Sequence, residues 1–156
     1  MNAAAIATPP DCGAVLPGFT FADSYAIEAP AGTDASAALR IFAGAAPGWM
    51  KALLNLRNTL GKLVGLKPAE GSGFPVISQS PERVCVGFDD WHLDFRVVTT
   101  AEPQHPKVSR VTLTTIVRTH NIAGRTYLAL IMPFHRLIAR ETLNRLNAPV
   151  TAPARR

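Results

Sequence analysis

The chain has 156 residues, of which 47% are hydrophobic and 17% charged, and its formal net charge is +5. This length suits one domain with a buried core, and the apolar content excludes a disordered chain. Two cysteines exclude a disulfide scaffold. Residues 1–106 hold 7 Lys and Arg against 10 Asp and Glu, whereas residues 107–156 hold 9 against 1. The basic C-terminal part indicates either an anionic partner or a solvated face that uses arginine.

The N-terminal third predicts a leader, a strand and two helices. Residues 1–15 are rich in Ala and Pro and lack the basic residues of a secretory signal, so we expect a flexible leader on a cytoplasmic protein. Residues 19–28 alternate like a strand, and residues 35–42 suit a short helix. Residues 49–67 carry leucines at helical spacing beside basic residues. They could contact an anionic membrane peripherally, although packing on a sheet explains the leucines better.

The remaining chain predicts a meander of strands and one long helix. Strands are expected at residues 74–80, 83–88, 91–101 and 107–121, with a loop at 102–106. Alternation in the two long strands indicates one buried and one solvated face. An amphipathic helix follows at residues 123–147, so the domain spans residues 16–147 and a frayed basic tail occupies 148–156. No segment is long and apolar enough to span a membrane.

This order of elements predicts an α+β fold rather than a parallel sheet. An antiparallel sheet would wrap around the long C-terminal helix, with two shorter helices after the first strand. The same order is found in the helix-grip fold of START-like domains, in which a ligand cavity lies between the sheet and the helix.

Four separated motifs carry a resemblance to a known family. In chain order they are residues 92–96 (HLDFR), 118–121 (RTHN) with 124–128 (GRTYL), and 133–136 (PFHR). They resemble the bacterial family called domain of unknown function 2867, over residues 16–146. In that family the domain occurs alone or behind a short-chain-dehydrogenase-like domain that binds NAD(P). The resemblance implies a role in small-molecule metabolism and a dehydrogenase-like protein as partner, and it supplies no catalytic residues.

The motifs contain polar residues that could lie close together. If the two long strands are antiparallel neighbours, Asp94 can pair with Arg118 or Arg110, either as a salt-bridged outer face or as part of a polar site. His120 precedes the last helix and could act as an acid or base, while Asn121 is equally an ordinary N-cap. His135 borders the apolar stripe of the helix and suits a boundary histidine or a ligand contact.

The leading interpretation is a module that binds a small, partly apolar and anionic metabolite rather than an enzyme. The expected ligand contacts are Arg118, His120, Asn121, Arg125, Tyr127 and His135. The alternative is an enzyme of cyclase or isomerase type in which His120 or His135 is the acid or base and Asp94 orients it. A third possibility is a non-catalytic accessory domain of the dehydrogenase-like partner.

Several classes of site are not indicated. Gly71-Ser72-Gly73 is too short for a dinucleotide or phosphate loop, so no cofactor is expected. His92 and Asp94 lack a third metal ligand at a defined spacing. The long strands lack the aromatic side chains on which bases stack, which speaks against nucleic-acid binding.

Overall fold

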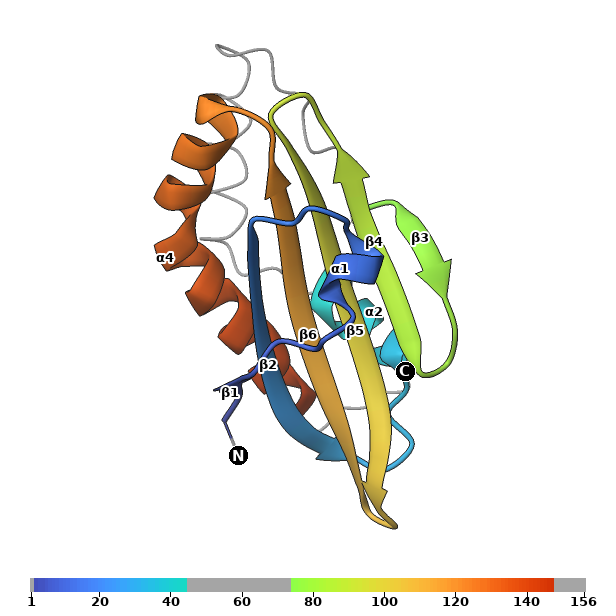
Figure 1. Ribbon diagram of the computed structural model, residues 1–156. Coiled ribbons are helices and arrows are strands. Elements are labelled where there is room, and N and C mark those ends of the chain that lie inside the picture. The colour runs from blue at the N-terminus through green and yellow to red at the C-terminus, as the bar shows by residue number, and fades with distance from the viewer. Residues whose placement is uncertain (1, 45–73, 148–156) are drawn as a thin grey trace, which may run out of the picture.

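The computed structural model describes residues 2–44 and 74–147 (Figure 1). Within these ranges lie six strands and three α-helices. The strands are β1 (Ala4–Ile6), β2 (Phe21–Pro30), β3 (Val76–Gln79), β4 (Arg83–Asp89), β5 (Leu93–His105) and β6 (Val108–Thr119). The helices are α1 (Cys12–Val15), α2 (Ala35–Gly44) and α4 (Ile122–Asn144), and α4 continues into the 3₁₀ turn η1 (Arg145–Asn147). The helix predicted at residues 49–67 and the tail at 148–156 lie outside the described residues.

The six strands form one antiparallel sheet in the order β1-β2-β6-β5-β4-β3. The α+β class, the antiparallel sheet and the long C-terminal helix are therefore confirmed. The longest strands, β5 and β6, lie at its centre. Strand β6 pairs with β2 and β5, and β5 pairs with β6 and, as far as Thr100, with β4. None of the helices in the described part of the chain is long and apolar enough to cross a membrane.

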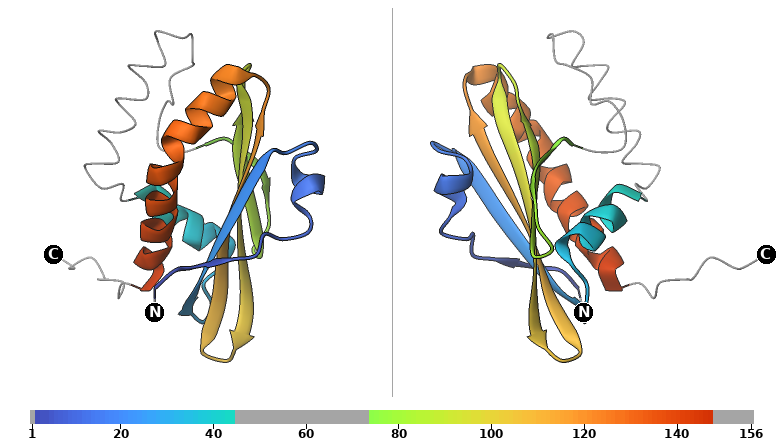
Figure 2. Two further views of the ribbon diagram at one scale, coloured as in Figure 1. Left: turned by 60° about the vertical axis from the view of Figure 1, so that its left-hand side comes forward. Right: turned by 90° about the vertical axis from the view of Figure 1, so that its right-hand side faces the viewer.

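Helices α2 and α4 cover one face of the sheet (Figure 2). Alternate residues of the strands point to this face, as the period of two requires. The main hydrophobic core lies there, where Val84, Val111 and Leu113 of the sheet meet Ala38 of α2 and Leu143 of α4. These side chains are all at least 93% buried, so this layer is filled by core residues in the described part.

The alternation had predicted that the opposite face is solvated, but part of this face is covered. Strand β1 pairs with β2, and α1 lies against the middle of the face, where Cys12 and Leu16 pack on Val98 and Ile116 (Figure 2). Thr114 on this face is only 3% exposed. Residues 1–15, predicted to be a flexible leader, thus contribute a strand and a helical turn. A polar residue at every second position shows which side chains share a face, but not whether a remote segment covers them.

The loop predicted at residues 102–106 is wrong, because β5 continues to His105. The two prolines of this stretch had suggested a break. Strand β4 pairs with β5 only as far as Thr100, so beyond it β5 has one neighbour, β6. Pro103 lies on this extension next to a register shift. A missing backbone N–H costs little where one side of the strand has no partner.

Candidate functional site

The candidate site lies where β6 ends and α4 begins. The register of β5 and β6 places Asp94 directly opposite Arg118, which is one of the two cross-strand pairings that the sequence had left open. Both side chains point to the face that carries α1. Just beyond the ends of β5 and β6, one more backbone hydrogen bond joins the two segments, from His120 N to His92 O at 3.0 Å. This bond brings the His120 side chain to the same face, beside Asp94.

The Asp94 carboxylate holds both neighbours. Its Oδ2 accepts hydrogen bonds from Arg118 Nε at 2.9 Å and from Arg118 Nη2, and its Oδ1 lies 2.9 Å from His120 Nε2. The Asp94 side chain is 4% exposed, whereas those of His120 and Arg118 are 33% and 39% exposed. A buried anion therefore fixes two surface groups that can each carry positive charge.

The same contacts set the protonation of the carboxyl group. Burial is the largest influence on the pKa of Asp94 and would raise it, but the hydrogen bonds and charges of His120 and Arg118 together hold it below its ordinary value. Asp94 is thus an ionised acceptor at neutral pH. An ionised carboxylate has no proton to donate, so the bond to His120 requires the proton on Nε2. Neutral His120 then carries its lone pair on Nδ1.

Arg118 is also fixed from the other side. Its Nη1 donates to the carbonyl of Pro17 at 3.1 Å, in the turn where Gly18 adopts a φ of +71° that favours glycine. Three of the five guanidinium N–H groups are consequently used within the protein. Arg118 thus ties the turn after α1 to the sheet, and its two other N–H groups make no hydrogen bond within the described residues.

Asn121 and Gly124 shape the start of α4. Asn121 is the N-cap of α4, which is one of the two roles that the sequence had suggested for it. Its Oδ1 accepts a hydrogen bond from Gly124 N at 3.0 Å, and its Nδ2 donates one to Trp91 O at 3.0 Å. A Cβ atom on Gly124 would lie 2.0 Å from His92 O, so only glycine lets the helix approach the strand this closely. Both polar ends of Asn121 are thereby occupied within the protein.

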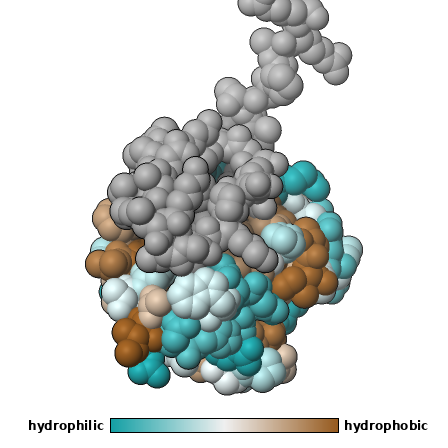
Figure 3. All heavy atoms as spheres, turned by 90° about the horizontal axis from the view of Figure 1, so that it is seen from above, coloured by the Kyte–Doolittle hydropathy of each residue, from teal (hydrophilic) through white to brown (hydrophobic). Residues whose placement is uncertain are grey.

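The other predicted contacts are distributed around this end. Arg125 is exposed in the first turn of α4. The Tyr127 ring makes an edge contact with buried His92, with 5.6 Å between ring centroids. Figure 3 looks down on this end and shows, outside its grey atoms, hydrophilic side chains between hydrophobic patches. Trp91 and Ile122 are large hydrophobic residues exposed here, by 52% and 80%.

His135 does not join the site. It lies on α4, on the other face of the sheet, with its Nε2 3.0 Å from Asp23 Oδ1 of β2. Tyr25 donates to the other oxygen of Asp23 at 3.3 Å, and the guanidinium of Arg140 lies 5.6 Å from the Tyr25 ring centre. Burial first, and Asp23 second, raise the pKa of Tyr25. This cluster fastens α4 to β2, which is the boundary role that the sequence had offered for His135.

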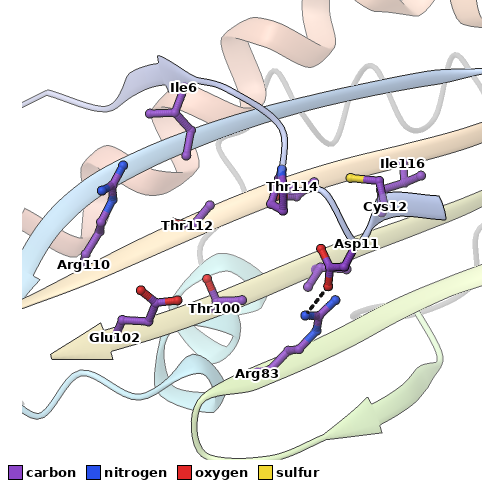
Figure 4. A pocket seen from close by; sticks show the side chains of 12 residues that line it. Ile6, Asp11, Cys12, Arg83, Thr100, Glu102, Arg110, Thr112, Thr114 and Ile116 are labelled. Carbon is purple, nitrogen blue, oxygen red and sulfur yellow. Dashed lines mark hydrogen bonds and ion pairs between the residues drawn. The ribbon is translucent and has the colours of Figure 1, made fainter. Parts of the chain in front are cut away.

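Sequence reasoning missed a cavity on the face of α1. It measures about 290 Å³ and lies between residues 6–12 and the sheet (Figure 4). None of the six predicted ligand contacts lines it. Its floor consists of Thr100, Thr112 and Thr114, whose alternation along β5 and β6 was the only available signal. Within the described ranges, no three His, Cys, Asp or Glu residues are grouped to hold a metal ion.

Comparison with known proteins identifies the family but no function. No curated protein matches the chain, and no solved structure matches it either, so the likeness to START-like domains stays a prediction. One family model matches residues 15–142, and its description is "Protein of unknown function (DUF2867)". This match includes β2 to β6, α2 and nearly all of α4, and with them every motif on which the resemblance was based. The chain therefore belongs to the DUF2867 family.

Proposed function

We propose that the protein is a cytoplasmic module that binds a small, partly apolar and anionic metabolite beside His120. The observation that carries the proposal is the buried Asp94 carboxylate, which holds His120 and Arg118 in place while a third or more of each side chain stays exposed. Groups that are fixed before binding lose little entropy when a ligand arrives. Arg118 has two further N–H groups for an anion, and His120 can donate to it from Nδ1 when the ring is protonated. Arg125 adds a positive charge one turn into α4, and the Tyr127 ring and Trp91 offer apolar surface nearby.

The test is native mass spectrometry of the protein purified without denaturation, followed by thermal-shift measurements with a panel of carboxylate- and phosphate-bearing metabolites. We expect a retained or stabilising ligand whose effect is lost in His120→Gln. Arg136→Gln is the matched control, because Arg136 is an exposed cation of α4 outside this end. A retained molecule that binds His120→Gln as tightly as the wild type, or a panel with no stabilising member, would contradict the proposal.

Acid or base catalysis is the second candidate, and the position of the His120 proton favours it. With Nε2 donating to Asp94, Nδ1 is a base whose orientation is fixed by a carboxylate, as in catalytic Asp–His pairs. For any reaction found, His120→Gln should lower kcat by at least about 100-fold. Asp94→Asn should also lower it, because an amide can donate to Nε2 and place the proton on Nδ1. Turnover that is unchanged in both variants would exclude this role.

An accessory role beside a dehydrogenase-like protein is the third candidate. Leu130, Phe134 and Leu137 recur at helical spacing on α4 and are 71%, 46% and 50% exposed, and an exposed apolar patch of this kind can mark a protein interface. We expect Leu130→Glu to abolish co-purification with such a partner and to leave folding intact. Retention of the partner by the variant would exclude this surface.

A further inference from the structure

The cavity beneath the N-terminal segment is separate from the His120 site. The side chains of β6 that point to this face form one row, from Arg110 through Thr112, Thr114 and Ile116 to Arg118. The first four of these side chains line the cavity, and α1 packs on the fourth, Ile116. At about 3.3 Å per residue, Thr114 and Arg118 lie roughly 13 Å apart along the strand. The core under α1 therefore divides the face into two sites.

The cavity combines polar and charged side chains with an apolar wall. Its apolar wall consists of Ile6, Pro9, Val98 and Ile116. Cys12 also lines it, and burial, the largest influence, raises the pKa of its thiol, so the group is a neutral thiol rather than a nucleophile at neutral pH. The cavity volume of about 290 Å³ is close to the lower end of the range for small-molecule pockets, which suits a small metabolite.

The four charged groups of the lining are not equivalent. Asp11 and Arg83 pair with one another at 2.7 Å and close the space between the N-terminal segment and β4. Arg110 and Glu102 are direct cross-strand partners on β6 and β5. Neither takes part in an ion pair within the described residues, although they lie at the same end of the cavity (Figure 4).

A cation and an anion that line one cavity without pairing can each receive the opposite charge of a ligand. Arg110 presents a guanidinium fork that matches a carboxylate, and Glu102 accepts hydrogen bonds from an ammonium group. The hydroxyl groups of Thr100 and Thr112 lie on the same two strands, directly opposite one another, and they supply both donors and acceptors. We propose that this cavity binds a small zwitterion of the α-amino acid class.

The chain offers a matched pair of glutamates for the test. Glu28 and Glu102 are both cross-strand partners of Arg110, one from β2 and one from β5. Only Glu102 lines this cavity. Glu102→Gln and Glu28→Gln therefore make the same change beside the same arginine, and only the first removes a group from the proposed site.

The experiment is an NMR titration of the ¹⁵N-labelled full chain with the proteinogenic α-amino acids, each beside its N-acetyl and carboxamide derivatives. We expect saturable shifts at the amides of Thr100, Thr112 and Thr114 with one free amino acid, and binding at least about tenfold weaker with either derivative. Glu102→Gln and Arg110→Gln should weaken binding to a similar extent, and Glu28→Gln should not. The proposal is overturned if no amino acid shifts these amides at millimolar concentration, if a derivative binds equally tightly, or if both glutamate variants behave alike.

Discussion

Replacing Gly124 by Ala tests the contact that joins α4 to the strand beside the site. A Cβ atom at this position would lie 2.0 Å from His92 O and 3.0 Å from His92 C. Real Cβ atoms essentially never approach another atom closer than 3.0 Å, so the helix and the strand must separate by about 1 Å. His92 O also accepts the hydrogen bond from His120 N at 3.0 Å, which the separation would strain.

The two opposing effects can be compared. Ala is favoured over Gly in a helix by about 1 kcal/mol. Overpacking a rigid contact costs about 1–3 kcal/mol, and loss of the His120 bond about 1 kcal/mol more. We therefore expect Gly124→Ala to lower the free energy of unfolding by about 2 kcal/mol, in opposition to helix propensity.

Urea denaturation followed by circular dichroism measures this difference, and Gly13→Ala is the matched control. Gly13 lies in α1, and a Cβ atom there would meet only Phe19 Cε1 at an ordinary 3.9 Å. The control should be unchanged or more stable by up to about 1 kcal/mol. If Gly124→Ala is as stable as the wild type, or gains as much as the control, the close approach of α4 to His92 is refuted.

Three further predictions concern the same elements. The pKa of Asp94 is lowered in the folded protein. Its contribution to stability is therefore present above the carboxyl pKa of the unfolded chain and is lost as the pH falls through the folded value. Unfolding curves should show a weaker acid dependence for Asp94→Asn, and an unchanged dependence would contradict the ion pairs. Asn121→Ala should cost about 1 kcal/mol through loss of the N-cap, and a neutral result in urea would exclude the cap. Burial is the largest influence on Cys12 and Cys85 and raises the pKa of both thiols, so both should react with iodoacetamide only after unfolding; mass spectrometry showing rapid labelling of the native protein would refute their burial.

The sequence predicted the fold class because its signals are local. Alternation along β5 and β6, and helical spacing along α4, each identify an element and the side chains that share one of its faces. The order of these elements then indicates an antiparallel sheet with a C-terminal helix, and the structure confirms it. The alternation also placed Asp94 on the same face as Arg118, once the two strands were assumed to be neighbours.

The candidate site could be predicted only in part. His120 and Asp94 were both candidates, but their contact depends on a strand register and on the turn into α4, which no local pattern contains. His135 was grouped with them because all three belong to the family motifs. The structure places it against Asp23 on the opposite face, because a motif shared by a family can serve packing as readily as ligand binding.

What the sequence determined by itself is therefore the family and the main elements, β2 to β6 with α2 and α4, together with the side chains that share a face of each. Tertiary structure alone decided that the N-terminal segment adds β1 to the edge of the sheet and places α1 on the face that had been expected to be solvated. It also decided that a cavity lined by Arg110 and Glu102 lies beneath them. The physical reason is that periodicity reports contacts between residues a few positions apart, whereas burial of this face depends on a segment about 100 residues away.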